Sequence, residues 1–509
     1  MVGLLFKDGS VFYMKKIINW FSDYENLILI GIILAAFLLR TYKFQEFFLY
    51  GPDNDLAGWI VKDIVVNHHW RLIGQQTSTM GVFVGPLYYY YLIPFYLLTK
   101  MDPIGSVYAI TILAMLSVVS VYFVFSRLFG KKTGLTASFI YSVSLFMINN
   151  DHDVVPTMPV ILWTVWYFYG INLLLKGDRK GYLLLGLLVG LMWHINMALV
   201  LVLPLIPLAL IIAREKINFK HLFTGALATL ILSIPLVIFE LRHNFSQVKA
   251  FVTSLTTSQS IVFTLAERLG RVIELTGRNL KQFLLPGTPD FHKTYLLLVL
   301  LIIFAVLIIK KIIAKKLAIV MSTWVLLYFV FFTLYSKVLS EYYLNGLTII
   351  WLAIITLPIG YLLKGGGWKK KLALIFLGGY FAVNHIAFAS VPINHSGYLE
   401  KKEIVAYIDQ DRLAHKYPCI AISYITEPGY DLGYRYFFWL RRMHVNAPIS
   451  RAPVYTIVFP LNKVNKVDRQ LGALGLIFPD YKKYNINQIA KSCSGANSNV
   501  VDSIPGYTE

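Results

Sequence analysis

Long apolar runs constrain this chain more than any other feature of its sequence. A helix of about 20 apolar residues crosses a bilayer, and most of the runs are close to that length. The run at 182–213 is longer, and Trp193-His194-Ile195-Asn196 interrupts it, so we interpret it as two short spans. The sequence therefore predicts about eleven membrane-spanning helices. The runs cover residues 26–40, 105–127, 133–149, 155–175, 182–213, 222–241, 294–313, 317–336, 345–363 and 372–390.

The composition agrees with a membrane protein. Of the 509 residues, 57% are hydrophobic and 15% are charged, whereas soluble domains average about 45–50% apolar and about 25% charged. The net charge of +20 does not indicate a nucleic-acid partner, because the basic residues lie beside the apolar runs, as membrane topology requires. The two cysteines, Cys419 and Cys493, follow the last run. The sequence is compatible with a disulfide between them and equally with two unpaired thiols.

Basic residues indicate which ends of the spans face the cytoplasm. If the N-terminus is inside and residues 87–99 stay out of the membrane, every short basic cluster lies on one side, as the positive-inside rule requires. If residues 87–99 crossed, all later clusters would face outward. We therefore expect this tyrosine-rich segment at the outer interface, a cytoplasmic N-terminus and an extracytoplasmic C-terminus. The clusters are Lys7, Lys15 and Lys16; Arg127, Lys131 and Lys132; Lys176, Arg179 and Lys180; Arg214, Lys216 and Lys220; Lys310, Lys311, Lys315 and Lys316; and Lys364, Lys369, Lys370 and Lys371.

The same topology divides the chain into two domains. Residues 1–390 form the predicted transmembrane module, with outer loops at 41–104 and 242–293. Residues 391–509 form an extracytoplasmic soluble domain. In this tail, residues 401–415 have the pattern of an amphipathic helix, and residues 419–425 and 454–459 have the pattern of strands. The predicted fold is an all-α polytopic membrane protein with a small C-terminal α/β domain.

Two acidic elements lie at the outer ends of early spans. Asp53 and Asp55 follow the first span, and Asp151 and Asp153 end the third. Carboxylates there suit a general base for an acceptor hydroxyl or a site for a hard cation such as Mg²⁺ or Mn²⁺. Helix caps and turns use the same residue types, so a structural role is the alternative. We take Asp53 and Asp55 as candidate catalytic residues, and Asp151 and Asp153 as candidate metal ligands.

Cationic and aromatic residues near the outer ends of the spans complete the candidate site. Arg242 and His243 end the span at 222–241, Lys337 lies between two later spans, and Arg71 lies in the first outer loop. Cations of this kind bind phosphate. The alternatives are an interfacial anchor for Arg242, a snorkelling lysine and a solvated arginine. The expected lining residues are Tyr88, Tyr89, His194, Glu240, Tyr342 and Tyr343, of which His194 is also explained as a hydrogen-bonded polar group.

Four stretches occur in a familiar order. They are Leu39-Arg40-Thr41-Tyr42 followed by Gly51-Pro52-Asp53, then Gly85-Pro86-Leu87-Tyr88-Tyr89-Tyr90, then residues 126–135, and then residues 235–243. Together they resemble the membrane-embedded GT-C glycosyltransferases, specifically glycosyltransferase family 39, the bacterial relatives of dolichyl-phosphate-mannose-protein mannosyltransferases. The likeness covers residues 25–390 in layout, and the tail carries none of it.

The resemblance implies an enzyme that uses a polyprenyl-phosphate-linked sugar donor. Many enzymes of this kind require no cofactor, so the use of Mg²⁺ or Mn²⁺ is open. The acceptor would be a hydroxyl of a lipid, glycan or protein, and the sugar carbon would be inverted. The family's first-loop aspartate, as base or acceptor-orienting group, corresponds to Asp53, with Asp55 as helper or substitute. Many members have Asp-Glu where this chain has Asp53-Asn54, so the division of labour between Asp53 and Asp55 is open. Arg242, His243 and Lys337 would stabilise charge on the departing phosphate.

Two other classes of function fit a polytopic membrane protein. A transporter or lipid flippase usually has inverted repeats and ionisable groups at the bilayer midplane, whereas the candidates here gather at one rim. A non-catalytic assembly subunit that presents the tail to a partner would tolerate the loss of Asp53. The sequence has no phosphate-binding loop of the GxxxxGK[ST] type and no HExxH motif, so nothing points to nucleotide hydrolysis or a zinc peptidase.

Overall fold

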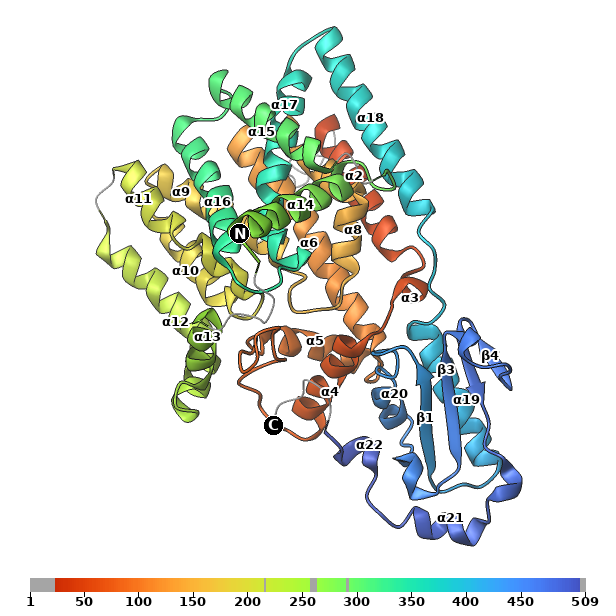
Figure 1. The fold of residues 1–509 in the computed structure, drawn as a ribbon. Helices are drawn as coiled ribbons and strands as arrows, with labels where there is room; N and C mark the ends of the chain where they lie inside the picture. Colours follow the sequence, from red (N-terminus) through yellow and green to blue (C-terminus); the bar gives the residue numbers. More distant parts are fainter. Residues whose placement is uncertain (1–22, 215–216, 257–262, 290–292, 504–509) are drawn as a thin grey trace, which may run out of the picture.

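The computed structural model describes residues 23–214, 217–256, 263–289 and 293–503. A helical bundle forms most of the molecule, and a small sheet domain lies below and to the right of it in Figure 1. Part of the sequence-based topology, namely Lys7, Lys15, Lys16 and Lys216, lies outside the described residues.

Each predicted apolar run forms helix. Six helices are long and apolar enough to cross a membrane by length and composition, among the residues described. The protein is thus a multi-pass membrane protein. The runs correspond in order to α2 (Tyr24–Thr41), α6 (Ile104–Phe129), α7 (Lys131–Val143) with α8 (Leu145–His152), α9 (Val160–Leu175), α10 (Lys180–Met192), η1 (Met197–Val202) with α11 (Leu205–Ala213), α12 (Phe219–Arg242), α15 (Lys293–Ile309), α16 (Lys315–Leu334), η3 (Glu341–Leu347) with α17 (Thr348–Lys364), and α18 (Trp368–Ala389).

Polar residues and prolines interrupt several of these runs. Ser144 separates α7 from α8, and its side chain accepts a hydrogen bond from the backbone N–H of Met147 at 3.5 Å. The predicted break at 193–196 is confirmed, because α10 ends at Met192 and the side chain of Asn196 caps η1. The segments that follow α8 and precede η1 supply residues to the pocket described below.

Two of the predicted basic clusters lie at the same end of the bundle. The ammonium group of Lys131 lies 2.7 Å from the carboxylate of Asp23, next to the start of α2. Lys364 donates a hydrogen bond of 3.3 Å to the carbonyl of Phe129. The second and the last predicted clusters therefore share one end with the start of α2, as the sequence-based topology requires. We call this the basic end.

The first outer loop lies at the opposite end. It contains α3 (Phe44–Phe47), α4 (Pro52–Val66) and α5 (Leu87–Leu98). In Figure 1, α4 and α5 lie at the lower edge of the bundle, beside α20 of the sheet domain. Tyr88, Tyr89 and Tyr96 of α5 are buried in a hydrophobic cluster with residues of α4. This cluster gives loop one a core of its own.

The second outer loop is largely helical, although the sequence analysis predicted no helices there. It contains α13 (Ser246–Thr256) and α14 (Leu265–Leu284). Thr264 and Glu267 form a capping box at the start of α14, a pattern that signals a helix start. Leu280 is buried in the main core, and Arg278 forms an ion pair of 2.6 Å with Glu341. This pair connects α14 to η3.

The C-terminal domain is a small α/β unit, as predicted. Its sheet has the order β2-β1-β3-β5-β4, with β1 parallel to β2 and β3 and with β5 antiparallel to β3 and β4. The predicted helix and both predicted strands are present. The elements are α19 (Tyr398–Ala414), β1 (Ile420–Thr426), α20 (Arg435–Leu440), β2 (Val445–Asn446), η4 (Pro448–Ser450), β3 (Val454–Phe459), η5 (Leu461–Lys463), β4 (Arg469–Leu471), β5 (Leu474–Ile477), η6 (Tyr481–Lys483), α21 (Ile486–Ser492) and α22 (Ser498–Val501).

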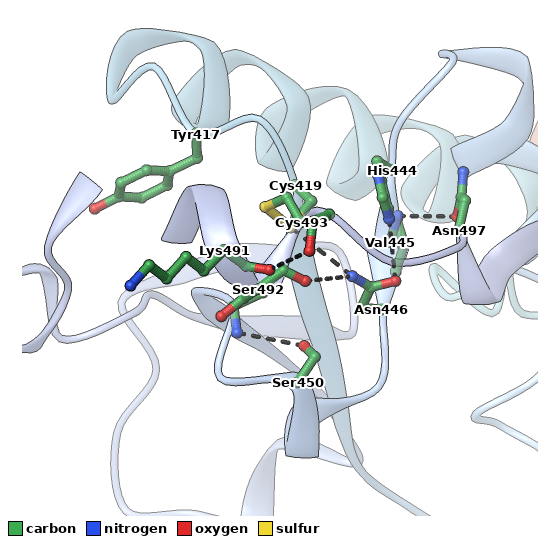
Figure 2. The surroundings of a disulfide bond; sticks show 12 residues. Tyr417, Cys419, His444, Val445, Asn446, Ser450, Lys491, Ser492, Cys493 and Asn497 are labelled. Atoms are coloured by element: carbon green, nitrogen blue, oxygen red, sulfur yellow. Dashed lines mark hydrogen bonds between the residues drawn. A yellow bond between two sulfur atoms is a disulfide. The ribbon is translucent and has the colours of Figure 1, made fainter. Parts of the chain in front are cut away.

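Cys419 and Cys493 form a disulfide, which decides between the two open alternatives (Figure 2). Their Cα atoms are 5.5 Å apart and their positions are 74 residues apart in the sequence. The bond joins the residue before β1 to the residue after α21. Disulfides persist mainly in oxidising compartments, so the bond agrees with a tail outside the cytoplasm.

Candidate functional site

A pocket of about 560 Å³ lies at the loop-one end of the bundle. Loop one, the segments after α8 and before η1, and parts of α13, α16 and η3 form its walls. One part of the lining is polar and another is apolar and aromatic. The polar lining residues include Asp53, Gln75, Gln76, Thr77, Ser78, Thr79, Asp153, Thr157, Asn196 and Ser254, and the apolar and aromatic ones include Met197, Leu201, Phe251, Phe331, Phe332, Tyr335, Tyr342 and Tyr343.

Two carboxylates from different loops face this pocket. Asp53 lies in the first turn of α4, and Asp153 directly follows α8. The residue between the two predicted loop-one aspartates holds the two segments together. Asn54 donates a hydrogen bond of 2.9 Å from Nδ2 to the carbonyl of Val154, while its Oδ1 accepts one of 2.7 Å from the N–H of Gly51. The hydrogen bond of Asn54 therefore explains why Asp53 and Asp153 lie at the same pocket.

Burial affects both carboxylates, and the charge of Asp53 affects Asp153. Burial raises the pKa of Asp53. Burial, and secondly the negative charge of Asp53, raise the pKa of Asp153 to about 6. Both side chains are open to the pocket itself, so the surrounding protein, rather than complete enclosure, removes their water. No Lys, Arg or His is present among the described lining residues. The pocket is therefore acidic and attracts a proton or a cation.

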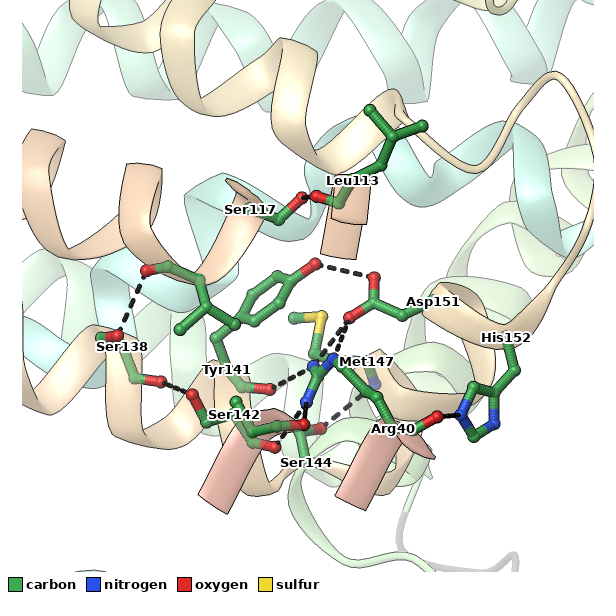
Figure 3. Close-up of polar contacts among 12 residues, drawn as sticks. Arg40, Leu113, Ser117, Ser138, Tyr141, Ser142, Ser144, Met147, Asp151 and His152 are labelled. Atoms are coloured by element: carbon green, nitrogen blue, oxygen red, sulfur yellow. Dashed lines mark hydrogen bonds and ion pairs between the residues drawn. The ribbon is translucent and has the colours of Figure 1, made fainter. Parts of the chain in front are cut away.

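Asp151 faces away from the pocket and forms a buried ion pair (Figure 3). Its Oδ2 lies 2.7 Å from Nη2 of Arg40, and its Oδ1 accepts a hydrogen bond of 2.9 Å from the hydroxyl of Tyr141. Arg40 also donates to the carbonyl of Ser142 at 2.9 Å. Both oxygens of Asp151 are thus engaged, and of the predicted metal ligands only Asp153 faces the pocket.

Asp55 also faces away from the pocket, toward the C-terminal domain. Its carboxylate accepts hydrogen bonds of 3.2 Å from the hydroxyl of Tyr50 and from the backbone N–H of Tyr436. Close by, the ammonium group of Lys401 donates to the carbonyl of Tyr50 at 3.0 Å and to that of Leu432 at 2.9 Å. Burial raises the pKa of Asp55 to about 6 and lowers the pKa of Lys401 to about 8. Asp55 therefore contributes to the contact between loop one and the tail.

Two of the predicted tyrosines line the pocket and two support it. Tyr342 and Tyr343 are lining residues, and the hydroxyl of Tyr343 contacts that of Ser78 in loop one. Tyr89 is buried behind the lining and donates a hydrogen bond of 3.0 Å to the side chain of Gln75. Tyr88 is also buried, and among the described residues its hydroxyl has no hydrogen-bond partner.

His194 attaches loop one to the break after α10. Its Nε2–H donates to the carbonyl of Leu232 at 2.9 Å, and its Nδ1 accepts from the N–H of Leu87 at 3.4 Å. A Cβ atom at Gly85 would collide with the imidazole ring, so a glycine at that position allows this contact. His194 is therefore a hydrogen-bonded polar group, the alternative that the sequence left open.

The predicted phosphate-binding cations do not line the pocket. Arg71 is buried and lies 3.1 Å from the carboxylate of Asp63. Arg242 and His243 are exposed at the end of α12, where His243 stacks on Phe239. Lys337 is half-buried and follows the lining residue Tyr335 by two positions. Glu240 accepts a hydrogen bond of 3.4 Å from the N–H of Val248 at the start of α13 and is likewise absent from the lining.

Several residues of the candidate site were not predicted from the sequence. Residues 75–79 form a polar wall of the pocket, and their sequence signal is a run of five polar residues in a loop that is otherwise rich in aromatic residues. Asn196 appeared only as part of a predicted break. Arg40 appeared only in a stretch that resembles a family, because nothing in the sequence pairs it with Asp151, which lies 111 positions away.

Comparisons with known proteins identify the fold. Residues 84–239 match the family described as dolichyl-phosphate-mannose-protein mannosyltransferase. The crystal structure of ArnT from Cupriavidus metallidurans bound to undecaprenyl phosphate matches with a TM-score of 0.58 and 11% sequence identity, over 89% of this chain and 97% of that chain. The apo state of the same protein gives a TM-score of 0.57 with the same identity and coverage. No protein of curated function matches in sequence.

These findings confirm the resemblance to GT-C glycosyltransferases and the predicted fold class. The matched segment contains two of the four sequence stretches, at 85–90 and 126–135, and the start of the stretch at 235–243. The structural likeness covers nearly the whole of the ArnT chain. At 11% identity it shows the shared fold, an all-α polytopic bundle with a small C-terminal domain.

Proposed function

We propose that this protein is an integral membrane glycosyltransferase. It moves a sugar from a polyprenyl-phosphate-linked donor to an acceptor hydroxyl on the extracytoplasmic face, with inversion at the sugar carbon. The observation that carries the proposal is the pair Asp53 and Asp153, which come from separate loops to one pocket. The family match at residues 84–239 and the undecaprenyl phosphate bound to a protein of the same fold support it.

In this proposal Asp53 is the general base. Its carboxylate takes the proton of the acceptor hydroxyl, for which it must come within about 3 Å of the acceptor oxygen. The acceptor oxygen attacks the anomeric carbon from the face opposite the phosphate, and the bond between that carbon and the phosphate oxygen breaks. The products are the glycosylated acceptor and the free polyprenyl phosphate. A single displacement of this kind inverts the sugar carbon and needs no enzyme nucleophile.

Asp153 assists by raising the basicity of the site. Two carboxylates that share a pocket disfavour each other's ionised state, and a base whose pKa lies closer to the working pH is the more effective one. Tyr342 and Tyr343 would line the sugar, and the polar residues 75–79 would bind its hydroxyl groups.

Positive charge for the donor phosphate has to come from next to the lining. Lys337 is our first candidate, because it follows the lining residue Tyr335 closely in the chain. Arg242, His243 and Arg71 would need side-chain or loop movement. Mg²⁺ is often held by one or two carboxylates together with substrate phosphates. Because Asp53 serves as the base, Asp153 is the lining carboxylate that would hold Mg²⁺ or Mn²⁺ if the enzyme uses one, and the ion would supply charge at the leaving phosphate.

The apolar side of the pocket suits the lipid part of the donor. Phe331 and Phe332 of α16, with Leu201 of η1, offer a surface for the isoprenoid units next to the phosphate. The acceptor, which is a lipid, a glycan or a protein, would enter from the side of loop one. The disulfide supports our orientation, with a cytoplasmic N-terminus and an extracytoplasmic tail.

The proposal is tested with the full-length protein in liposomes that contain a polyprenyl-phosphate-linked sugar and membrane acceptors. We expect Asp53→Asn to abolish transfer while the protein still folds and inserts. A matched control is Asp178→Asn in the turn between α9 and α10, where an asparagine still caps the backbone N–H of Lys180. Transfer at the wild-type rate by Asp53→Asn would overturn the role of Asp53. Lipid translocation without transfer by the wild-type protein would favour a flippase.

A further inference from the structure

A second groove lies at the basic end of the bundle, far along the helices from loop one. Its volume is about 700 Å³, and helices α2, α7, α17 and α18 form its walls. The lining is mostly apolar, with Ile32, Phe139 and Leu377 among its residues. None of the residues proposed above for catalysis or donor binding contributes to it. It is therefore independent of the proposed active site.

The groove faces the hydrocarbon region of the membrane. Its lining residues Ile28, Leu374 and Phe381 are 47%, 52% and 42% exposed. Along α18 the lining extends from Lys370 to Phe381, which corresponds to about 16 Å at a rise of about 1.5 Å per residue. One leaflet accounts for about half of a hydrocarbon core of about 30 Å. The groove is thus about as deep as one leaflet.

The mouth of the groove carries excess positive charge. Lys132 and Lys370 belong to the lining. Lys132 donates to the neutral carbonyl of Leu363 at 3.0 Å, and for Lys370 no acidic partner exists among the described residues. Glu25, the acidic lining residue, already lies 3.6 Å from the ammonium group of Lys131. The charges of Lys132 and Lys370 remain available to an anion.

We propose that this groove binds one anionic glycerophospholipid from the leaflet at the basic end. An acyl chain lies along α2 and α18, and Lys132 and Lys370 hold the phosphate. Basic pockets between membrane helices on the cytoplasmic side are known to bind anionic headgroups. A polyprenyl chain, which is much longer than one leaflet, does not fit the depth of the groove.

The first test fills the apolar part of the groove. Gly378 lines it, and a Cβ atom there meets no other atom within 4 Å. Gly379 has equally free space but does not line the groove, so it provides a matched control. The full-length protein is released from nanodiscs that contain phosphatidylglycerol and phosphatidylcholine, and native mass spectrometry counts the lipids that remain bound. We expect Gly378→Phe to reduce bound phosphatidylglycerol about tenfold, because the phenyl ring occupies space that the acyl chain needs, and Gly379→Phe to leave it unchanged.

The second test removes the positive charge at the mouth of the groove. It remains informative even if Gly378→Phe does not fold. Replacing both Lys132 and Lys370 by Gln is expected to abolish the preference for phosphatidylglycerol over phosphatidylcholine. The control replaces Lys369 and Lys371 by Gln, because these exposed neighbours lie outside the groove. Three outcomes would each overturn the proposal: equal lipid retention by all variants, equal retention of both lipids by the wild-type protein, and a bound mass that equals a polyprenyl phosphate.

Discussion

Asn54 donates a hydrogen bond of 2.9 Å to the main-chain carbonyl of Val154, so the residues directly before these two, Asp53 and Asp153, are held at the same pocket. The contact joins the start of α4 to the segment after α8, two parts of the chain that are 100 positions apart. Asn54 makes this contact through its side-chain amide. Here its amide supplies a donor that a carboxylate lacks.

The coupling of the two carboxylates predicts the pH dependence of transfer. A general base acts in its ionised form, and burial raises the pKa of Asp53, so kcat/KM should fall on the acid side at a higher pH than for an ordinary aspartate. In Asp153→Asn the carboxylate of Asp53 loses a like charge, its pKa decreases, and the acid limb moves to lower pH. Rate profiles between about pH 5 and about pH 8 measure this shift. An acid limb at the same pH in both proteins would show that the two groups do not interact.

Asp55→Asn should leave the transfer rate close to that of the wild type, because Asp55 bonds to Tyr50 and Tyr436 rather than facing the pocket. Its effect should appear in stability. Burial raises the pKa of Asp55 from 3.8 to about 6, so the folded protein binds this proton more tightly than the unfolded chain does. The contribution of the Asp55 carboxyl group to the free energy of unfolding is fully present below about pH 4 and is lost as the pH rises through about 6.

The melting temperature of the wild type should therefore fall relative to that of Asp55→Asn across this interval. Intrinsic fluorescence during heating measures it at both ends of the interval. A folded Asp55→Asn protein that no longer transfers sugar would instead assign Asp55 a part in the chemistry.

The ion pair between Arg40 and Asp151 should contribute strongly to stability where α2 packs against α8. Arg40→Met leaves a buried carboxylate without its cation, which typically costs about 3–5 kcal/mol. Replacing both partners, with Arg40→Met and Asp151→Leu, should restore part of this loss, because no charge then stays buried. Thermal unfolding in detergent compares the single, the double and the exposed control variant Arg179→Met. Equal melting temperatures for all of them would contradict a structural role for the pair.

Lys337→Met should weaken donor binding more than it slows the chemical step. A hydrogen bond to a charged group contributes about 1.5–3 kcal/mol, so KM for the lipid-linked donor should rise at least about tenfold. Initial rates at varied donor concentration measure this. If chelation by EDTA abolishes activity and Mg²⁺ or Mn²⁺ restores it, while Lys337→Met has no effect, the positive charge comes from a cation at Asp153.

The sequence predicted the helices well because their signals are local. The run of apolar residues, the break at 193–196 and the alternation in strand β3 each depend on neighbouring residues only. Asp53 was also predicted to be at the site, since it lies in the loop that follows the first span on the outer side. Asp55 could have been excluded by helix geometry, because residues two positions apart on a helix do not face the same way.

The rest of the site depends on contacts that no local pattern encodes. The pairing of Arg40 with Asp151 arises only when α2 and α8 pack together. The polar wall at residues 75–79 lies in irregular backbone. Such a segment has no hydrophobic periodicity from which its position could be predicted. The exposed positions of Arg242 and His243 follow from where α12 ends relative to loop one. Each of these features became visible only in three dimensions.

The docking of Asp55 and Lys401 between loop one and the tail has a practical consequence for protein engineering. A shortened version without the C-terminal domain would lack the backbone N–H of Tyr436 and the ammonium group of Lys401, and would expose to water Trp59 of α4, which contacts the ring of Tyr436. Such a truncation is not a minimal enzyme, however complete its helices are. Chimeras with a related protein should exchange loop one and the C-terminal domain together, because Asp55 and Lys401 join them.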